Sequence, residues 1–275
     1  MRLDDDGDRS NVEDQRGSRS GVGLKLGLGG TVALIVLSVV FKQDMFALLG
    51  AAPGGAPALS EAEVQQRTSA EKGLERTAVA TFNDVQRTWS GEVRSYRPAK
   101  LVLFWDEVQS GCGGASAAMG PFYCPVDEKV YVDLGFYREL ATRFGAPGAF
   151  AQAYVVAHEV GHHLQNVLGT AGKVRAAEER DPGARNALSV RLELQADCFA
   201  GVWGRAAKDR NLLDPGDVEQ GLNAAAAVGD DRIQKAATGR VKPESFTHGS
   251  AAERMRWFRR GLETGRVDAC DTFAR

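Results

Sequence analysis

Apolar and polar positions follow a helical period along much of this 275-residue chain. The clearest pattern covers residues 149–168, where alanine, valine, leucine and phenylalanine fall on one face at about 100° per residue. Similar stripes cover 189–201 and 251–262. Residues 218–237 are rich in alanine, with a glycine–aspartate interruption at 229–231. These patterns predict a mostly helical protein.

Two of the expected helices begin with a capping box, a serine followed three residues later by a glutamate. Ser60 with Glu63 opens one helix, and Ser250 with Glu253 opens another. Residues 169–186 are charged and contain proline and glycine, which indicates either a loop or a surface helix.

Strand patterns are confined to two segments. Residues 101–108 are rich in β-branched and aromatic side chains, and residues 129–134 alternate apolar with polar positions. Glycine- and proline-rich loops lie between the two segments. Two strands among many helices predict an α+β fold that is mostly helical and contains a small sheet.

A continuous apolar run occupies residues 26–41. With the residues just before it, the run approaches the roughly 20 apolar residues that span a bilayer. Several arginines and a lysine precede the run, whereas Lys42 alone follows it closely, and this bias predicts a cytoplasmic N-terminus. We therefore expect a transmembrane helix at 21–41. A buried soluble helix is one competing interpretation. A cleaved signal peptide, with small residues around 56–58, is another.

These features divide the chain into four parts. Residues 1–20 are polar and acidic, which predicts a disordered cytoplasmic arm. The membrane helix at 21–41 and a Pro/Gly/Ala-rich linker at 42–69 follow. Residues 70–275 form one domain, which we expect on the extracytoplasmic side of a single-pass membrane protein. The apolar content of 43% suffices for a core, and the net charge of −2 gives no indication of a nucleic-acid partner.

The polar face of the expected helix at 149–168 carries candidate chemistry. His158 and His162 are four residues apart and project from the same side of that helix. Both imidazoles can reach one metal ion, and zinc readily takes such nitrogen ligands. Glu159 flanks that face and can accept a proton from a water that zinc has made more acidic. A chance match is the alternative, but the helical phasing argues against it. We expect His163 to be a surface residue and not a ligand.

A third ligand is expected from the helix at 189–201, because catalytic zinc usually takes three protein ligands and keeps one position for water. Glu193 and Asp197 are four residues apart on one face of this helix. Glu193 can bind the metal, and Asp197 can hydrogen-bond the second ring nitrogen of a histidine ligand. Taken alone, both could be ordinary solvated acids; the preceding histidine motif favours the metal-site interpretation.

The last histidine, His248, stands in a loop just before the helix at 251–262. In one interpretation it reaches the cleft and stabilises the oxyanion of a tetrahedral intermediate. In the other it is a structural residue that bonds a nearby carbonyl. The arginines of the following helix are expected to form a solvated face.

The four cysteines fit two disulfides if the domain is exported to an oxidising compartment. Three pairings are conceivable, and free thiols are the alternative. Cys112 and Cys124 are neighbours within one loop, and pairing them leaves Cys198 and Cys270 for each other. We therefore expect one disulfide that closes a short loop and one that ties the C-terminus to the helix bearing Glu193.

Five segments together resemble a known family, the membrane-anchored neutral zinc metallopeptidases of bacteria. They are GPFYCP at 120–125, VYVDL at 130–134, AYVVAHEVGHHLQ at 153–165, RLELQADCFAG at 191–201 and FTHGSAAER at 246–254. The resemblance covers roughly residues 70–275 and implies a gluzincin-like zinc peptidase domain. The spacing of Glu193 and Asp197 is similar to that in the third-ligand helix of membrane-associated zinc peptidases.

The sequence therefore predicts a zinc-dependent metallopeptidase that hydrolyses peptide bonds in a peptide or protein substrate. His158, His162 and Glu193 would hold Zn²⁺. Glu159 would be the general base towards a zinc-activated water and would later pass the proton to the leaving amine. Neither a cleavage preference nor an oligomeric state follows from these patterns.

A second function remains open at this point, a membrane-anchored, non-catalytic binding or assembly module with a structural metal site. A closed structural site needs a fourth protein ligand. His248 or Asp197 could supply that ligand. The presence of Glu159, which metal binding does not require, argues for chemistry.

Overall fold

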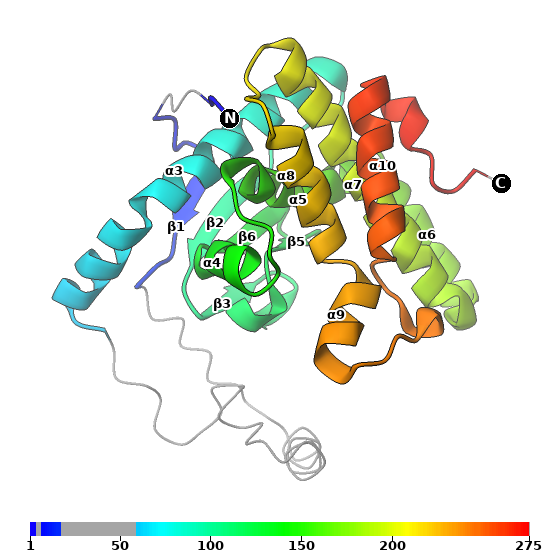
Figure 1. Cartoon of the computed structure of the whole chain (residues 1–275), viewed down its shortest axis with the longest axis horizontal. Helices are drawn as coiled ribbons and strands as arrows, with labels where there is room; N and C mark the ends of the chain where they lie inside the picture. The colour runs from blue at the N-terminus through cyan, green and yellow to red at the C-terminus, as the bar shows by residue number, and fades with distance from the viewer. Residues whose placement is uncertain (4–6, 18–58, 275) are drawn as a thin grey trace, which may run out of the picture.

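The computed structural model describes residues 1–3, 7–17 and 59–274 (Figure 1). In this part of the chain the helices are α3 (Glu61–Glu92), α4 (Gly135–Thr142), α5 (Ala149–Val167), α6 (Thr170–Arg180), α7 (Arg185–Asp209), α8 (Asp217–Ala227), α9 (Asp230–Thr238) and α10 (Ala251–Thr264). The strands are β1 (Val12–Asp14), β2 (Lys100–Phe104), β3 (Glu107–Ser110), β4 (Gly113–Ser116), β5 (Phe122–Cys124) and β6 (Lys129–Asp133). The mostly helical α+β class is confirmed, and the segment after α5 is the surface helix α6.

Four of these strands form one small sheet in the order β1-β2-β6-β5. β1, β2 and β6 are parallel, and β5 is antiparallel to β6. The strand expected at 101–108 is broken, because Asp106 has a positive φ of 61° and separates β2 from the β3–β4 hairpin. The second expected strand is confirmed as β6.

Helix α5 lies in the middle of the helical part and contacts α3, α7 and α8 (Figure 1). It is buried on almost every side, as is typical of a helix within a domain core. Phe150, near its start, stacks on Trp203 of α7 with 5.7 Å between the ring centroids. The cleft described below lies along one face of this helix, so the helix that carries the histidine motif is also the centre of the core.

Glycines let the helices around the histidine motif approach closely. A Cβ atom at Gly161 of α5 would lie 3.0 Å from the carbonyl oxygen of Ala196 in α7. A Cβ atom at Gly201 would lie 2.1 Å from the carbonyl oxygen of Phe258, and one at Gly261 would lie 1.9 Å from that of Cys198. Helix α7 is therefore in backbone contact with both α5 and α10.

The N-terminal segment differs from its expected disordered state. Residues 12–14 form strand β1, which lies beside β2 and near α3 in Figure 1. The segment looked disordered because it is short and polar, yet its acidic Glu13 pairs with Lys129 of β6 at 2.7 Å. The expected linker is also partly ordered, since α3 begins at Glu61 with the predicted capping box.

The transmembrane helix expected at 21–41 lies outside the described residues. Among the helices that the structure does describe, none is long and apolar enough to cross a membrane.

Candidate metal centre

Helices α5 and α7 bring three potential ligands together. His158 and His162 project from α5, one turn apart, and Glu193 faces them from α7. The Nε2 atom of His158 lies 3.2 Å from one Glu193 oxygen, and that of His162 lies 3.4 Å from the other. One ligand atom from each residue lies within 4.8 Å of the other two, a grouping that could hold a metal ion. In the described part of the chain, no other group of three or more His, Cys, Asp or Glu side chains lies close enough together to hold a metal ion.

Each histidine uses its other ring nitrogen to contact a neighbouring side chain. The Nδ1 atom of His158 lies 2.9 Å from Asp197, and that of His162 lies 2.9 Å from the Gln165 amide oxygen. The amide nitrogen of Gln165 donates to the carbonyl oxygen of Leu192, at 2.7 Å, so its oxygen is the atom free to accept. Both Nδ1 atoms therefore carry the proton in the metal-binding form, and both Nε2 atoms are left for the metal.

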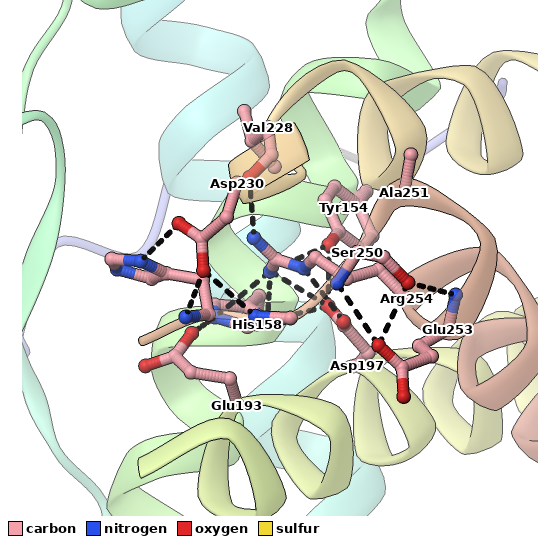
Figure 2. Close-up of polar contacts among 12 residues, drawn as sticks. Tyr154, His158, Glu193, Asp197, Val228, Asp230, Ser250, Ala251, Glu253 and Arg254 are labelled. Atoms are coloured by element: carbon pink, nitrogen blue, oxygen red, sulfur yellow. Dashed lines mark hydrogen bonds and ion pairs between the residues drawn. The ribbon is translucent and has the colours of Figure 1, made fainter. Parts of the chain in front are cut away.

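A buried arginine completes the surroundings of His158, as Figure 2 shows. Arg254 of α10 donates from Nε and Nη2 to the two oxygens of Asp197, at 2.8 and 3.0 Å. Its Nη2 also donates to the Tyr154 hydroxyl at 3.1 Å, and its Nη1 to the carbonyl oxygen of Val228 at 3.1 Å. Arg254 is 3% exposed, so the expectation of a solvated arginine face is wrong at this position.

These contacts set the charges of the buried groups. Burial alone would raise the pKa of Asp197, but Arg254 and His158 outweigh it and hold that pKa below its usual value. Burial alone would lower the pKa of His158. Asp197 and then Glu193 outweigh that effect and raise the pKa to about 10 in the metal-free protein. Asp197 is thus an ionised carboxylate that orients the imidazole of His158.

Glu159 lies beside the three potential ligands and lines the same cleft. The cleft has a volume of about 700 Å³ and is bounded by α5, α6, α7 and the segment from Ala117 to Tyr123. Glu159 is 8% exposed. Burial raises the pKa of its carboxyl, although His162 and His158 oppose the rise. A carboxylate with a raised pKa accepts a proton more readily than an ordinary surface glutamate.

His248 also lines the cleft, and Asp230 holds it there. The Nδ1 atom of His248 lies 3.3 Å from one Asp230 oxygen. The other oxygen accepts backbone N–H groups from Thr247, His248 and Gly249 at 2.7, 2.7 and 3.0 Å. The bond to Asp230 raises the pKa of His248 and so favours its protonated, hydrogen-donating form. Within the described residues, the His248 ring contacts the Thr247 hydroxyl and the Asp230 carboxylate and no carbonyl oxygen of the kind expected for a structural histidine.

His163 differs from its expected place on the surface. Its side chain is fully buried, with Nδ1 near the Tyr123 hydroxyl at 3.0 Å and Nε2 bonded to the carbonyl oxygen of Arg97. Burial lowers the pKa of His163, which keeps the ring neutral. His163 therefore joins α5 to β5 and lies outside the group of three.

The cysteines form the expected pairs, Cys112–Cys124 and Cys198–Cys270. The second disulfide is connected to the metal centre by hydrogen bonds. Gln195 donates to the carbonyl oxygen of Cys270 at 3.0 Å and accepts from Gln165 at 3.2 Å. Gln165 is the residue that contacts His162, so the C-terminal disulfide lies at the end of a polar chain leading to a ligand.

Four residues of this site were missed in the sequence: Tyr154, Gln165, Asp230 and Arg254. Two of them carried a local signal. Tyr154 lies one turn before His158 on the same helix face, and Gln165 lies one turn after His162. Arg254 and Asp230 reach the site only through the tertiary fold, so helical spacing could not reveal them.

The chain matches a family model described as "Putative neutral zinc metallopeptidase" over residues 1–273. The chain belongs to this family. It is 42% identical over 279 residues to "Uncharacterized protein YpfJ" of Escherichia coli (strain K12), covering 96% of each. It is also 42% identical over 251 residues to "Uncharacterized protein Rv2575" of Mycobacterium tuberculosis (strain ATCC 25618 / H37Rv), covering 82% of this chain and 84% of the relative. No solved structure shows significant similarity to it. Family membership therefore extends over both β1 and the metal centre.

Proposed function

We propose that this chain is a zinc-dependent metallopeptidase of the gluzincin type that hydrolyses peptide bonds in peptide or protein substrates. The main support is that His158, His162 and Glu193 lie close together in one cleft, with Glu159 beside them. Two imidazole nitrogens and one carboxylate form a ligand set that suits catalytic zinc, which keeps a further position for water or substrate. The name of the family supports the same assignment.

In this proposal, zinc when bound supplies Lewis acidity, which polarises the scissile carbonyl and makes water a stronger acid. Glu159 takes the proton of the attacking water, because its carboxylate lines the cleft next to the ligands and its pKa is raised by burial. It then returns that proton to the leaving amine as the peptide bond breaks. Glu159 is thus first a base and then an acid.

Two further residues act on charge and position. His248 donates a hydrogen bond to the oxygen that becomes negative in the tetrahedral intermediate, and the Asp230 carboxylate holds it in the protonated form. Arg254 is a positioning residue, since it fixes the Asp197 carboxylate, which in turn orients His158.

The non-catalytic alternative requires a fourth protein ligand. Asp197 is fully buried and already bonded to His158, Arg254 and Tyr154. His248 bonds Asp230 and is not part of the described group of three ligands. This arrangement supports an open catalytic site over a closed structural one.

The test is metal analysis of the purified protein combined with a peptide-library digest of wild type and Glu159→Gln. We expect about one zinc per chain in both proteins and cleavage by wild type alone. Glu139→Gln is the matched control, because Glu139 lines the same cleft but lies outside the ligand group. Cleavage that persists in Glu159→Gln, or its absence from zinc-loaded wild type, would contradict the proposal.

We also propose that the domain of residues 70–275 lies outside the cytoplasm and is attached to the membrane through the apolar segment at 21–41. The two disulfides support an oxidising compartment. Reporter fusions placed after residue 275 should be active only outside the cytoplasm; cytoplasmic activity would overturn this location.

A further inference from the structure

Residues 7–17 are built into the same folded unit as the metal centre. Strand β1 pairs in parallel with β2, in the register Val12 to Leu101 and Asp14 to Leu103. The N–H of Leu101 donates to the carbonyl oxygen of Asn11, and the N–H of Gln15 donates to that of Leu103, each at 2.8 Å. β1 thus covers the edge of β2 that β6 does not occupy.

Buried charges fasten this segment to α3. The Arg16 side chain is 2% exposed and bonds Glu75 at 2.6 Å, with Glu71 at 3.5 Å. Glu71 is itself 1% exposed. Glu71 also lies 3.5 Å from Arg138, and Glu75 also pairs with Arg9, so removing Arg16 would take away part of the positive charge around two largely buried carboxylates, which is destabilising. Arg16 therefore contributes to the stability of the domain as well as to the docking of its own segment.

Other contacts reach further across the molecule. The Asn83 side chain of α3 donates to the carbonyl oxygen of Asp8 at 2.8 Å. Glu13 pairs with Lys100 of β2 at 3.1 Å and with Lys129 of β6 at 2.7 Å. The segment is thus bonded to α3, β2 and β6, three elements that follow residue 59.

This packing has a consequence for membrane topology. The charge bias of the sequence predicts a single crossing between an N-terminal cytoplasmic arm and an extracytoplasmic domain. A single crossing between residues 17 and 59 would place β1 and β2 on opposite sides of the membrane, and the two strands could not pair. We infer that residues 7–17 lie in the same compartment as residues 59–274, with β1 as the edge strand of the zinc-site domain. The membrane attachment proposed above through residues 21–41 would then not be a single crossing. This inference does not depend on peptidase activity.

Cysteine labelling of the full-length protein in spheroplasts tests the shared compartment. All four native cysteines are in disulfides, so an introduced cysteine is the single reactive thiol. Ser10→Cys reports on the N-terminal segment and Arg240→Cys on the domain, because both positions are exposed. A membrane-impermeant maleimide is applied before and after permeabilisation. We expect the same pattern for both variants. The inference would be overturned if one variant were labelled in intact spheroplasts and the other were labelled only after permeabilisation.

A stability measurement tests the docking independently. In the purified full-length protein, Arg16→Gln should lower the Tm by about 5 °C, because Glu71 and Glu75 lose one of their buried partners. Arg240→Gln is the matched control at an exposed arginine and should leave the Tm unchanged. Equal Tm values for the two variants would show that residues 7–17 are not docked and would overturn the inference.

Discussion

Loss of the Cys198–Cys270 disulfide should affect both the fold and the metal centre. The two cysteines are 72 residues apart, and cross-linking a loop of that length stabilises the folded state by about 4 kcal/mol in the chain-entropy model. The Cys112–Cys124 disulfide, with a separation of 12, is worth about 3 kcal/mol in the same model. Replacing either pair by alanine should therefore lower the free energy of unfolding by similar amounts.

Metal affinity is what should distinguish the two disulfides. The carbonyl oxygen of Cys270 accepts from Gln195, which contacts Gln165, whose amide oxygen contacts His162. Displacing Cys270 removes the acceptor that holds this chain of side chains. Groups that orient a metal ligand typically contribute about 10–100-fold to metal affinity. We expect a zinc affinity about tenfold lower for Cys198→Ala/Cys270→Ala.

Two measurements separate these effects. Urea unfolding of the full-length variants gives the loss in stability, and competition with a chelator under native conditions gives zinc affinity. The Cys112→Ala/Cys124→Ala protein is the matched control, since it loses a disulfide without disturbing Gln195. Equal zinc affinities for the two double variants would refute the proposed coupling through the glutamines.

Four further results are expected. Glu193→Ala should lower the zinc content of the purified protein, because it removes one of three ligands; full zinc content would refute the assignment. Zinc binding to the metal-free protein near pH 7.5 should release about one proton, measurable by calorimetry in buffers of different ionisation enthalpy, because the pKa of His158 is raised to about 10 and the ligand must be neutral. For the same reason, protonated His158 should stabilise the metal-free protein fully below pH 6.5, and this stabilisation should be lost as the pH rises through about 10. The measurement is the free energy of unfolding of wild type and His158→Gln as a function of pH, and a difference between them that does not change with pH would contradict the prediction. Gly161→Ala should destabilise the protein by about 1–3 kcal/mol in urea unfolding, because the added Cβ would lie 3.0 Å from the Ala196 oxygen; unchanged stability would mean that α5 and α7 are not in such close contact.

The parts of the fold that the sequence predicted well are those with local causes. Helix α5 and the two capping boxes follow from residues within a few positions of each other. The grouping of His158, His162 and Glu193 followed from two helical spacings and the coordination preference of zinc. The sequence patterns alone gave these residues without any knowledge of how α5 and α7 pack.

The parts that the sequence missed depend on distant partners. Strand β1 is three residues long and polar, so its order comes from β2 and α3 and not from its own propensity. The burial of His163 comes from Tyr123 and Arg97, which are 40 and 66 residues away. The break at Asp106 came from a left-handed backbone conformation that a strand-like composition conceals.

Arg254 shows why one of these long-range contacts matters for the chemistry. It is 57 residues from Asp197 in sequence, and both side chains are buried. In the metal-free protein Asp197 faces two cations, Arg254 and protonated His158. When a metal ion binds, His158 must lose that proton, and the charge next to Asp197 changes. Arg254 remains, so the Asp197 carboxylate stays ionised and able to accept from the Nδ1–H of His158 in both states. Without Arg254, the Asp197 carboxylate of the metal-bound site would be balanced only by the ion on the far side of the imidazole, so Arg254 is the cation in direct contact with Asp197 in both states.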